Sequence, residues 1–277
     1  MSKTAERWRL IVDSPCDGPT NMAIDEAILE AVGRGDMPPT LRLFAWEPAC
    51  LSLGYAQPAA DVDAERLAAH GWDIVRRMTG GRAILHTDEL TYSVALPQAH
   101  PLVAGTIPDS YRRLSMALLH ALERLGVPAH ADKVEKLAGT AVSRPGPVCF
   151  EVPSNYEITA NGKKLIGSAQ VRKHDAALQH GSLPLQGDLG RICDALVFRD
   201  EAARQDARSR VTQRATTLLE TLQHSVTWEA AANAVRSAFA ETFSLELEEA
   251  GLSAFEVQRT RELRRARYAC NDWTCKL

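Results

Sequence analysis

Residues 148–170 read V-C-F-E-V-P-S-N-Y-E-I-T-A-N-G-K-K-L-I-G-S-A-Q, and the rest of the chain is organised around this stretch. Asn161-Gly162 is the strongest short-range sequence signal for a β-hairpin. The stretch therefore predicts two short strands joined by a tight turn. Cys149 precedes this hairpin, and Lys164 follows the turn fifteen positions later in the chain.

The pairing of Cys149 with Lys164 suggests a chemical role. A hairpin brings together positions that are distant in the sequence, and an ammonium beside a thiol stabilises the thiolate. Such a neighbour lowers a cysteine pKa from about 8.5 to about 7 or below. We therefore expect Cys149 to be a covalent nucleophile that Lys164 activates.

Composition narrows the class of protein. The chain has 277 residues, 45% of them hydrophobic and 24% charged, as in an ordinary soluble globule. Its net charge of −3 argues against nucleic acid or an anionic membrane surface as a partner. The sequence has no signal-peptide core and no apolar run of membrane-spanning length, so we expect a cytoplasmic protein. The six cysteines lack zinc-site spacing, and we expect no metal.

Hydrophobic periodicity and turn residues divide most of the chain into expected elements. We expect strands at 8–12, 40–45, 50–55, 72–76 and 90–96, and helices at 61–70, 109–125, 228–243 and 255–268.

The first helix is expected to begin at an N-cap on Thr20 or Asn21, after a turn rich in proline and glycine. Apolar residues then recur at helical spacing. Asp25, Glu26 and Glu30 fall between the apolar positions, so they are expected on the polar side of the helix.

Strand-like sequence ceases after Leu189, and residues 199–267 look helical and highly charged. We therefore expect one catalytic domain spanning 1–277. Its sheet-containing core should cover about 8–190, and a mainly helical C-terminal part about 191–277.

Residues 76–86 read R-R-M-T-G-G-R-A-I-L-H and connect two expected strands. Adjacent glycines reach backbone conformations closed to other residues and leave their N–H groups unshielded. The segment therefore suggests a binding loop, although a plain β-hairpin with Gly-Gly in its turn fits the same letters.

Several basic residues lie near the stretch and this loop. They would suit an acidic protein or a phosphate-bearing group, but scattered surface arginines are the commoner explanation of such a set. The residues are Arg76, Arg77, Arg82, Arg112, Arg113, Lys163, Lys164, Arg172 and Lys173.

Three blocks together resemble the biotin/lipoate protein-ligase superfamily. They are Arg76-Arg77-x-x-Gly80-Gly81-x-Ala83-x-x-His86, Lys164-x-x-Gly167-Ser168-Ala169 and His180-Gly181-Ser182-Leu183. The blocks fall across about half of the chain, and none is specific alone. The resemblance implies an α/β fold with a mixed central sheet flanked by helices.

Two features separate the branches of this superfamily. Lipoate–protein ligases activate a free acid with ATP, and they typically carry a third glycine after the Gly-Gly pair and no cysteine at the position of Cys149. Here Arg82 stands at the place of that glycine. The chain therefore resembles the cysteine-dependent octanoyltransferases of lipoate biosynthesis.

The resemblance also implies partners and site residues. The donor would be octanoyl-acyl carrier protein, and the acceptor a lysine of a lipoyl domain such as that of the glycine-cleavage H protein. No cofactor is expected, because a thioester is already activated. Cys149 and Lys164 would be catalytic. Substrate binding is expected at Arg77, Thr79, Gly80, Gly81, Arg82, His86, Gly167, Ser168, Ala169, His180 and Gly181.

Finer roles follow for some of these residues. The small Gly167 and Ala169 would let an eight-carbon chain lie along a strand. Backbone N–H groups near Gly80-Gly81 or Gly167-Ser168 are candidates for an oxyanion site. His86 and His180 would orient the carriers or contact phosphopantetheine, or they would have only structural roles.

Three alternatives stay open at this stage. One is an ATP-dependent lipoate–protein ligase. Another is an amidotransferase that moves octanoyl or lipoyl groups between lipoyl domains with the same cysteine and lysine. The last is a catalytically silent module that binds lipoyl or biotin domains.

Overall fold

The computed structural model describes residues 5–132 and 157–277, and within it the expected hairpin is present. Strand β8 (Glu157–Ala160) pairs antiparallel with β9 (Lys163–Lys173). The turn residues Asn161 and Gly162 have positive φ angles of 52° and 75°, as a tight Asn-Gly turn requires. The hairpin prediction is therefore confirmed, whereas Cys149 lies outside the described residues.

The hairpin belongs to a mixed sheet with the strand order β11-β1-β2-β6-β10-β9-β8-β7. The central strand β10 (Ala176–Pro184) pairs antiparallel with β6 (Glu89–Pro97) and β9. Strand β2 (Thr40–Phe44) pairs antiparallel with β6 and parallel with β1 (Glu6–Val12). Strands β11 (Leu245–Glu249) and β7 (Ala129–Asp132) lie at the two edges.

A smaller sheet has the order β4-β3-β5. It carries the glycine loop, residues 77–83, which joins β4 to β5. Its strands are β3 (Cys50–Leu53), β4 (Asp73–Arg76) and β5 (Ile84–His86). Because β3 lies between β4 and β5, the loop that joins the two outer strands crosses over the middle one. The plain-hairpin alternative for this loop is therefore wrong.

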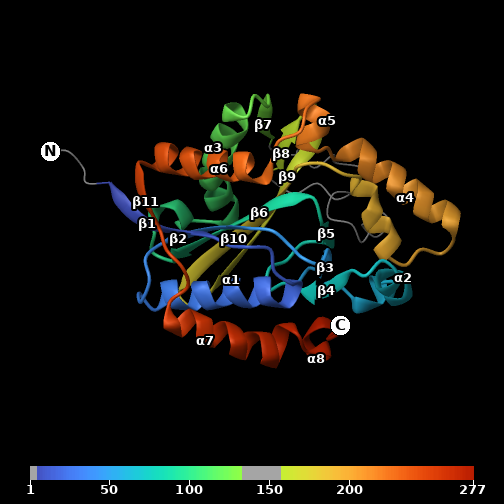
Figure 1. Cartoon of the computed structure of the whole chain (residues 1–277), viewed down its shortest axis with the longest axis horizontal. Helices are drawn as coiled ribbons and strands as arrows, with labels where there is room; N and C mark the ends of the chain where they lie inside the picture. The colour runs from blue at the N-terminus through green and yellow to red at the C-terminus, as the bar shows by residue number, and fades with distance from the viewer. Residues whose placement is uncertain (1–4, 133–156) are drawn as a thin grey trace.

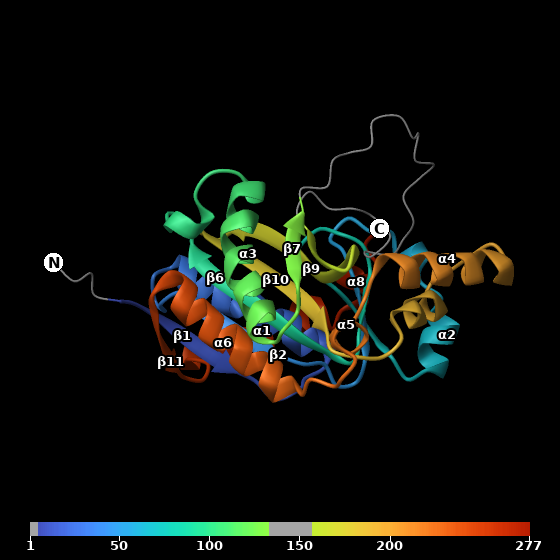
Figure 2. The same ribbon diagram turned by 90° about the horizontal axis from the view of Figure 1, so that it is seen from above.

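Helices cover both faces of the large sheet (Figures 1 and 2). Helices α3 (Ile107–Arg124) and α6 (Trp228–Phe243) pack on one face, and α1 (Gly18–Gly33) lies on the other with α7 (Ala254–Leu263) outside it. A π-helical turn, Arg264–Tyr268, follows α7. The remaining elements are α2 (Ala64–Ala69), α4 (Glu201–Arg214), α5 (Leu218–Leu222), α8 (Asn271–Thr274) and the 3₁₀ helices Ala59–Asp61, Pro101–Val103 and Leu189–Ala195.

Apolar residues fill the space on both sides of the large sheet and beside the small one. Helices α2 and α4 lie together near the small sheet, at the end of the molecule away from the N-terminus (Figure 1). In the part of the chain that the structure describes, no helix is both long and apolar enough to cross a membrane.

Two expectations for helix α1 are wrong. The N-cap is Asp17, three residues before the nearer expected cap, and its side chain accepts a hydrogen bond from the backbone N–H of Thr20. Asp25 and Glu26 are buried and do not form a solvated polar face. The reason is that α1 is sandwiched between the sheet and α7, so even its charged positions face protein.

The expectation that strands end near Leu189 is also wrong. Residues 245–249 form β11, which pairs parallel with β1 at the edge of the large sheet. The pattern L-E-L-E-E alternates with the strand period of two. That signal was available in the sequence, but it is short and stands between two strongly helical segments.

Candidate active site

A pocket lies between the glycine loop and the central strands β9 and β10. It contains most of the residues that the three sequence blocks contribute, although they come from segments far apart in the chain. Thr79 and Arg82 are the two expected substrate-binding residues that do not line it. The lining residues are Trp46, Arg77, Gly80, Gly81, Ile84, His86, Thr91, Gly167, Ser168, Ala169, His180, Gly181 and Ser182.

Strand register decides which of these side chains face the loop. Gly167 pairs with Ser182, and Ala169 pairs with His180. Directly paired residues point to the same face of a sheet, and His180 contacts Thr79 of the loop. Gly167 and Ala169 therefore leave space on the loop side of the sheet, where larger side chains would fill the pocket.

The alternate residues of the two strands point to the other face. A Cβ on Gly181 would lie 2.7 Å from the Gly167 carbonyl oxygen and 2.5 Å from Ser168 Oγ, so a glycine is needed there. Ser168 Oγ lies 2.8 Å from the Tyr92 hydroxyl. Burial raises the pKa of Tyr92 to about 12, so the phenol stays neutral beneath the pocket.

The backbone of the glycine loop is held by its carbonyl groups. Tyr55 N–H donates to the Thr79 oxygen (2.8 Å), and Arg77 Nη2 donates to the oxygens of Gly80 (3.1 Å) and Arg82 (3.0 Å). A Cβ on Gly54 would lie 1.9 Å from the Gly81 oxygen, so that carbonyl also faces protein.

The opposite side of each of these peptides carries an N–H group. In a trans peptide the C=O and the N–H point in opposite directions, so the N–H groups of Gly80, Gly81 and Arg82 point away from the groups that hold the carbonyls. A Cβ on Gly80 would meet nothing within 4 Å. The loop can therefore present successive N–H groups to an oxyanion or another anionic group.

His86 is fixed on several sides. Its Nε2 lies 2.6 Å from Ser52 Oγ and its Nδ1 lies 2.8 Å from Glu89 Oε1. The Trp46 ring stacks on the imidazole with centroids 3.9 Å apart. Burial opposes ionisation of Glu89, but attraction to His86 and hydrogen bonds with its neighbours outweigh burial and lower the pKa of the carboxyl. Ser52 also accepts from Arg77, which links His86 to the glycine loop.

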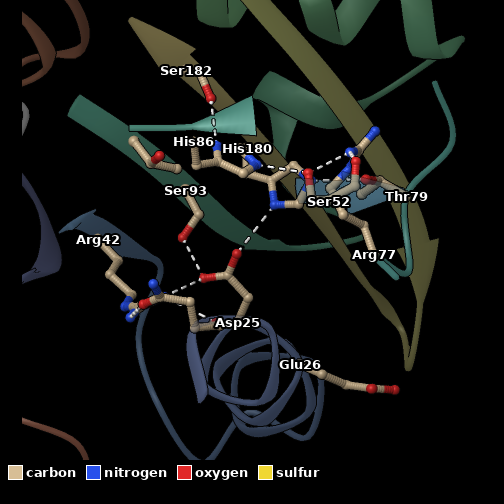
Figure 3. Close-up of polar contacts among 12 residues, drawn as sticks. Asp25, Glu26, Arg42, Ser52, Arg77, Thr79, His86, Ser93, His180 and Ser182 are labelled. Atoms are coloured by element: carbon tan, nitrogen blue, oxygen red, sulfur yellow. Dashed lines mark hydrogen bonds and ion pairs between the residues drawn. The ribbon is translucent and has the colours of Figure 1, made fainter. Parts of the chain in front are cut away.

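His180 is the centre of a second buried network, shown in Figure 3. Its Nε2 lies 2.8 Å from Thr79 Oγ1, and its Nδ1 lies 3.2 Å from Asp25 Oδ2 on α1. Asp25 Oδ1 accepts from Arg42 Nη1 and from Ser93 Oγ, each at 2.9 Å. Burial opposes the charge on Asp25, but the hydrogen bond with His180 and the charge of Arg42 lower the pKa of its carboxyl. Burial lowers the pKa of His180, which favours neutral imidazole.

The paired arginines that begin the loop both donate to backbone carbonyl groups. Arg77 is buried and also donates to the Ser52 carbonyl oxygen at 2.7 Å. Arg76 is fully buried and donates to the carbonyl oxygens of Gly54 (2.9 Å), Gln57 (2.6 Å) and Thr274 (2.7 Å). These two guanidinium groups therefore hold backbone, and their burial shows that Arg76 and Arg77 are not scattered surface arginines.

Lys164 is buried on β9, and its Nζ lies 2.7 Å from Glu157 Oε1. Its backbone oxygen accepts from Thr216 N–H at 3.0 Å. The pairing with Glu157 was not expected, although a Glu and a Lys on the two strands of a hairpin are a common cross-strand pair. Because Cys149 lies outside the described residues, its distance from Lys164 is not part of this geometry.

Other site residues were also missed from sequence. Asp25, Ser52 and Glu89 each contact a pocket histidine or arginine, yet none belongs to the three blocks. Asp25 gave no separate signal, because Glu26 and Glu30 are charged positions of the same helix.

Glu26, Glu30 and His174 form the one cluster with metal-ligand spacing in the described ranges. Arg267 and Lys173 already pair with Glu26. Burial opposes ionisation of Glu26, but hydrogen bonds from these two cations and Tyr268 lower its pKa to about 2. The cluster therefore has the character of an ion-pair network between α1 and the C-terminal segment.

Comparison with known proteins shows the family of the chain. The family model of the lipoyl protein ligase A/B catalytic domain matches residues 17–240. The chain belongs to this family. It is 42% identical to the octanoyltransferase LipM of Moorella thermoacetica, over 97% of this chain and 98% of that protein. It is 38% identical to the LipM of Kyrpidia tusciae, again over 97% and 98% of the two chains.

Solved structures support the fold. A bipartite lipoate protein ligase of Thermoplasma acidophilum superposes with a TM-score of 0.81 at 24% identity, covering 98% of this chain and 96% of that one. A lipoate-protein ligase A bound with ATP superposes with a TM-score of 0.79 at 24% identity, covering 97% and 98%. The expected α/β fold, a mixed sheet flanked by helices, is confirmed. The relatives also favour a transferase over the ATP-dependent ligase.

Proposed function

We propose that this protein is an octanoyltransferase of lipoate biosynthesis. It takes octanoate from a thioester of acyl carrier protein, holds it as a thioester on Cys149, and passes it to a lysine of a lipoyl domain such as that of the glycine-cleavage H protein. The observation that carries the proposal is the full-length similarity to octanoyltransferases at 42% identity. The cysteine of the sequence stretch and the absence of a third glycine at Arg82 agree with it.

The pocket suits an acyl chain bound along a strand. Gly167 and Ala169 leave the loop-facing side of β9 open, and Trp46 and Ile84 supply apolar walls. Each buried methylene contributes about 0.8 kcal/mol, so the six methylenes of an octanoyl group contribute about 5 kcal/mol. That contribution is large enough for pocket depth to select chain length.

The first half-reaction exchanges one thioester for another. The Cys149 thiolate attacks the octanoyl carbonyl carbon, a new C–S bond forms, and the bond to the carrier sulfur breaks. The departing thiolate takes a proton from the Lys164 ammonium or from water. The N–H groups of Gly80 and Gly81 stabilise the tetrahedral oxyanion, an interaction often worth about 3–4 kcal/mol per donor.

The second half-reaction forms the amide. The acceptor amine attacks the Cys149 thioester, the thiolate leaves, and the surplus proton of the amine passes to neutral Lys164 or to water. Glu157, whose Oε1 lies 2.7 Å from Lys164 Nζ, positions the amine at the hairpin. Because the acyl group waits on the enzyme, the two carrier proteins need not occupy the site together.

Intact-protein mass spectrometry tests this proposal. The enzyme is mixed with octanoyl-acyl carrier protein without ATP, beside Cys149→Ser, Lys164→Ala and, as a control, Cys275→Ala at an exposed cysteine. We expect a gain of one octanoyl group in the wild type and in Cys275→Ala, no adduct that neutral hydroxylamine removes in Cys149→Ser, and slow acylation in Lys164→Ala.

Other outcomes identify the alternatives. Transfer that needs ATP and free octanoic acid would refute the proposal in favour of a ligase. Acylation by octanoylated H protein but not by octanoyl-acyl carrier protein would make the protein an amidotransferase. The absence of both an enzyme adduct and acyl transfer with octanoyl-acyl carrier protein, with octanoylated H protein, and with free octanoic acid and ATP would point to a binding module.

A further inference from the structure

We propose that Asp25 is a positioning residue for the glycine loop and that it acts through His180 and Thr79. This inference rests on the proposed function, in which the N–H groups of the loop bind the acyl carbonyl. Asp25 lies on α1, on the far side of His180 from the loop (Figure 3). It would therefore influence the reaction without touching the substrate.

The hydrogen bonds around Asp25 fix the position of one proton. Oδ1 accepts from Arg42 and Ser93, and Oδ2 faces His180 Nδ1 at 3.2 Å. An ionised carboxylate only accepts hydrogen bonds, so Nδ1 of His180 carries the proton. In the neutral ring Nε2 is then an acceptor, and Thr79 Oγ1, 2.8 Å away, donates to it.

Thr79 connects this chain of hydrogen bonds to the glycine loop. It is fully buried, and it immediately precedes Gly80 and Gly81, which are exposed. Its backbone oxygen accepts from Tyr55, so side chain and main chain are both held. Two successive glycines have great conformational freedom, and fixed neighbours are what keep their N–H groups in one orientation.

Asp25→Asn reverses the direction of this hydrogen-bond chain. Arg42 and Ser93 both donate to Oδ1, so the amide oxygen of Asn stays with them and the NH₂ group turns toward His180. That NH₂ needs an acceptor at Nδ1, so the imidazole proton moves to Nε2. Nε2 then donates to Thr79, whose own buried hydroxyl proton loses its acceptor.

The first readout is the tautomer of His180, measured by long-range ¹H–¹⁵N NMR of histidine-labelled enzyme without substrate. His180→Gln assigns the signal. We expect Nδ1–H in the wild type and Nε2–H in Asp25→Asn. Glu30→Gln is the matched control, because it makes the same chemical change on α1 at a carboxylate that pairs with Arg259 instead. That variant should keep the wild-type tautomer.

The second readout is the rate of acyl-enzyme formation. A misdirected buried hydrogen bond weakens the positioning of the loop, so we expect the maximal acylation rate of Asp25→Asn to fall about ten- to hundred-fold, which corresponds to about 1.4–2.7 kcal/mol. The carrier concentration at half-maximal rate should change less than about two-fold. Thr79→Val should show the same loss with Asp25 and Arg42 intact, and Thr79→Ser should restore most of the rate.

Several results would overturn the inference. These are an Nε2–H tautomer in the wild type, an unchanged tautomer in Asp25→Asn, or full acylation rates in Thr79→Val. If Asp25→Asn does not fold, Thr79→Val and Thr79→Ser decide the role of the hydroxyl. A wild-type enzyme that forms no acyl adduct would instead refute the proposed function, while the NMR experiment would still decide the proton order.

Discussion

Replacement of Ala169 by valine tests whether the acyl chain lies along β9. Ala169 lines the pocket and pairs with His180, so its side chain points toward the glycine loop. Valine adds two methyl groups at this point. Because β-branched residues are favourable in strands, the fold should tolerate the change.

The expected magnitude follows from the volume that the two methyl groups occupy. They displace one or two methylenes of a bound chain, and each methylene is worth about 0.8 kcal/mol, or about four-fold in rate. The kcat/KM for octanoyl relative to hexanoyl carrier should therefore fall about four- to fifteen-fold. Shorter chains, which do not reach the added methyl groups, should be transferred at nearly the wild-type rate.

The assay compares octanoyl, hexanoyl and butanoyl thioesters of acyl carrier protein with one lipoyl-domain acceptor. Ala131→Val on the edge strand β7 is the control, because it makes the same change at an exposed strand position. An unchanged octanoyl-to-hexanoyl ratio in folded Ala169→Val would show that the chain does not lie there. An equal loss for all three lengths would also refute the reasoning, since it would indicate damage to the chemistry itself.

Two further predictions concern stability. The pKa of Glu26 is about 2 against a usual 4.5, so its carboxylate stabilises the fold by about 3 kcal/mol above pH 4.5, and this is lost as the pH falls toward 2. In urea unfolding, the free energy of unfolding of the wild type should therefore exceed that of Glu26→Gln at pH 7, and this difference should shrink at pH 3. A difference that is the same at both pH values would contradict the low pKa of Glu26. Arg76→Lys should lose several hydrogen bonds to carbonyls and cost about 3 kcal/mol or more. The rate of amide hydrogen exchange should then rise at residues 271–277. Unchanged rates there would show that Arg76 does not hold the C-terminal segment.

The sequence determined those elements whose signals are local. The Asn161-Gly162 turn was predicted because only a few dipeptides accept two positive φ angles in succession. Helix α6 was predicted to the residue, 228–243, because apolar residues recur along it at helical spacing. The structure adds Thr227 as its N-cap. Strand β11 was missed because five residues carry too few periods to outweigh helical neighbours.

Most residues that line the pocket were named as binding residues from sequence, but Trp46, Ile84, Thr91 and Ser182 were not, and neither was the arrangement predicted. Motif spacing identified the glycine loop, Gly167 to Ala169 and the histidines through a family resemblance. It did not identify Asp25, which lies 155 positions from His180 in the chain. In the sequence alone, Asp25 and Glu26 have the spacing of the solvent-exposed side of an amphipathic helix. Only packing against the sheet and α7 makes them buried.

The sequence by itself thus determined the turn, the main helices, the family and the motif blocks that supply most of the pocket lining, because turn geometry, periodicity and motif spacing act over short stretches of chain. Only the tertiary structure decided which histidine meets which carboxylate, which strand face opens toward the loop, and which arginines hold backbone. These depend on strand register and on hydrogen bonds between segments distant in sequence, and burial makes such bonds costly to leave unmade.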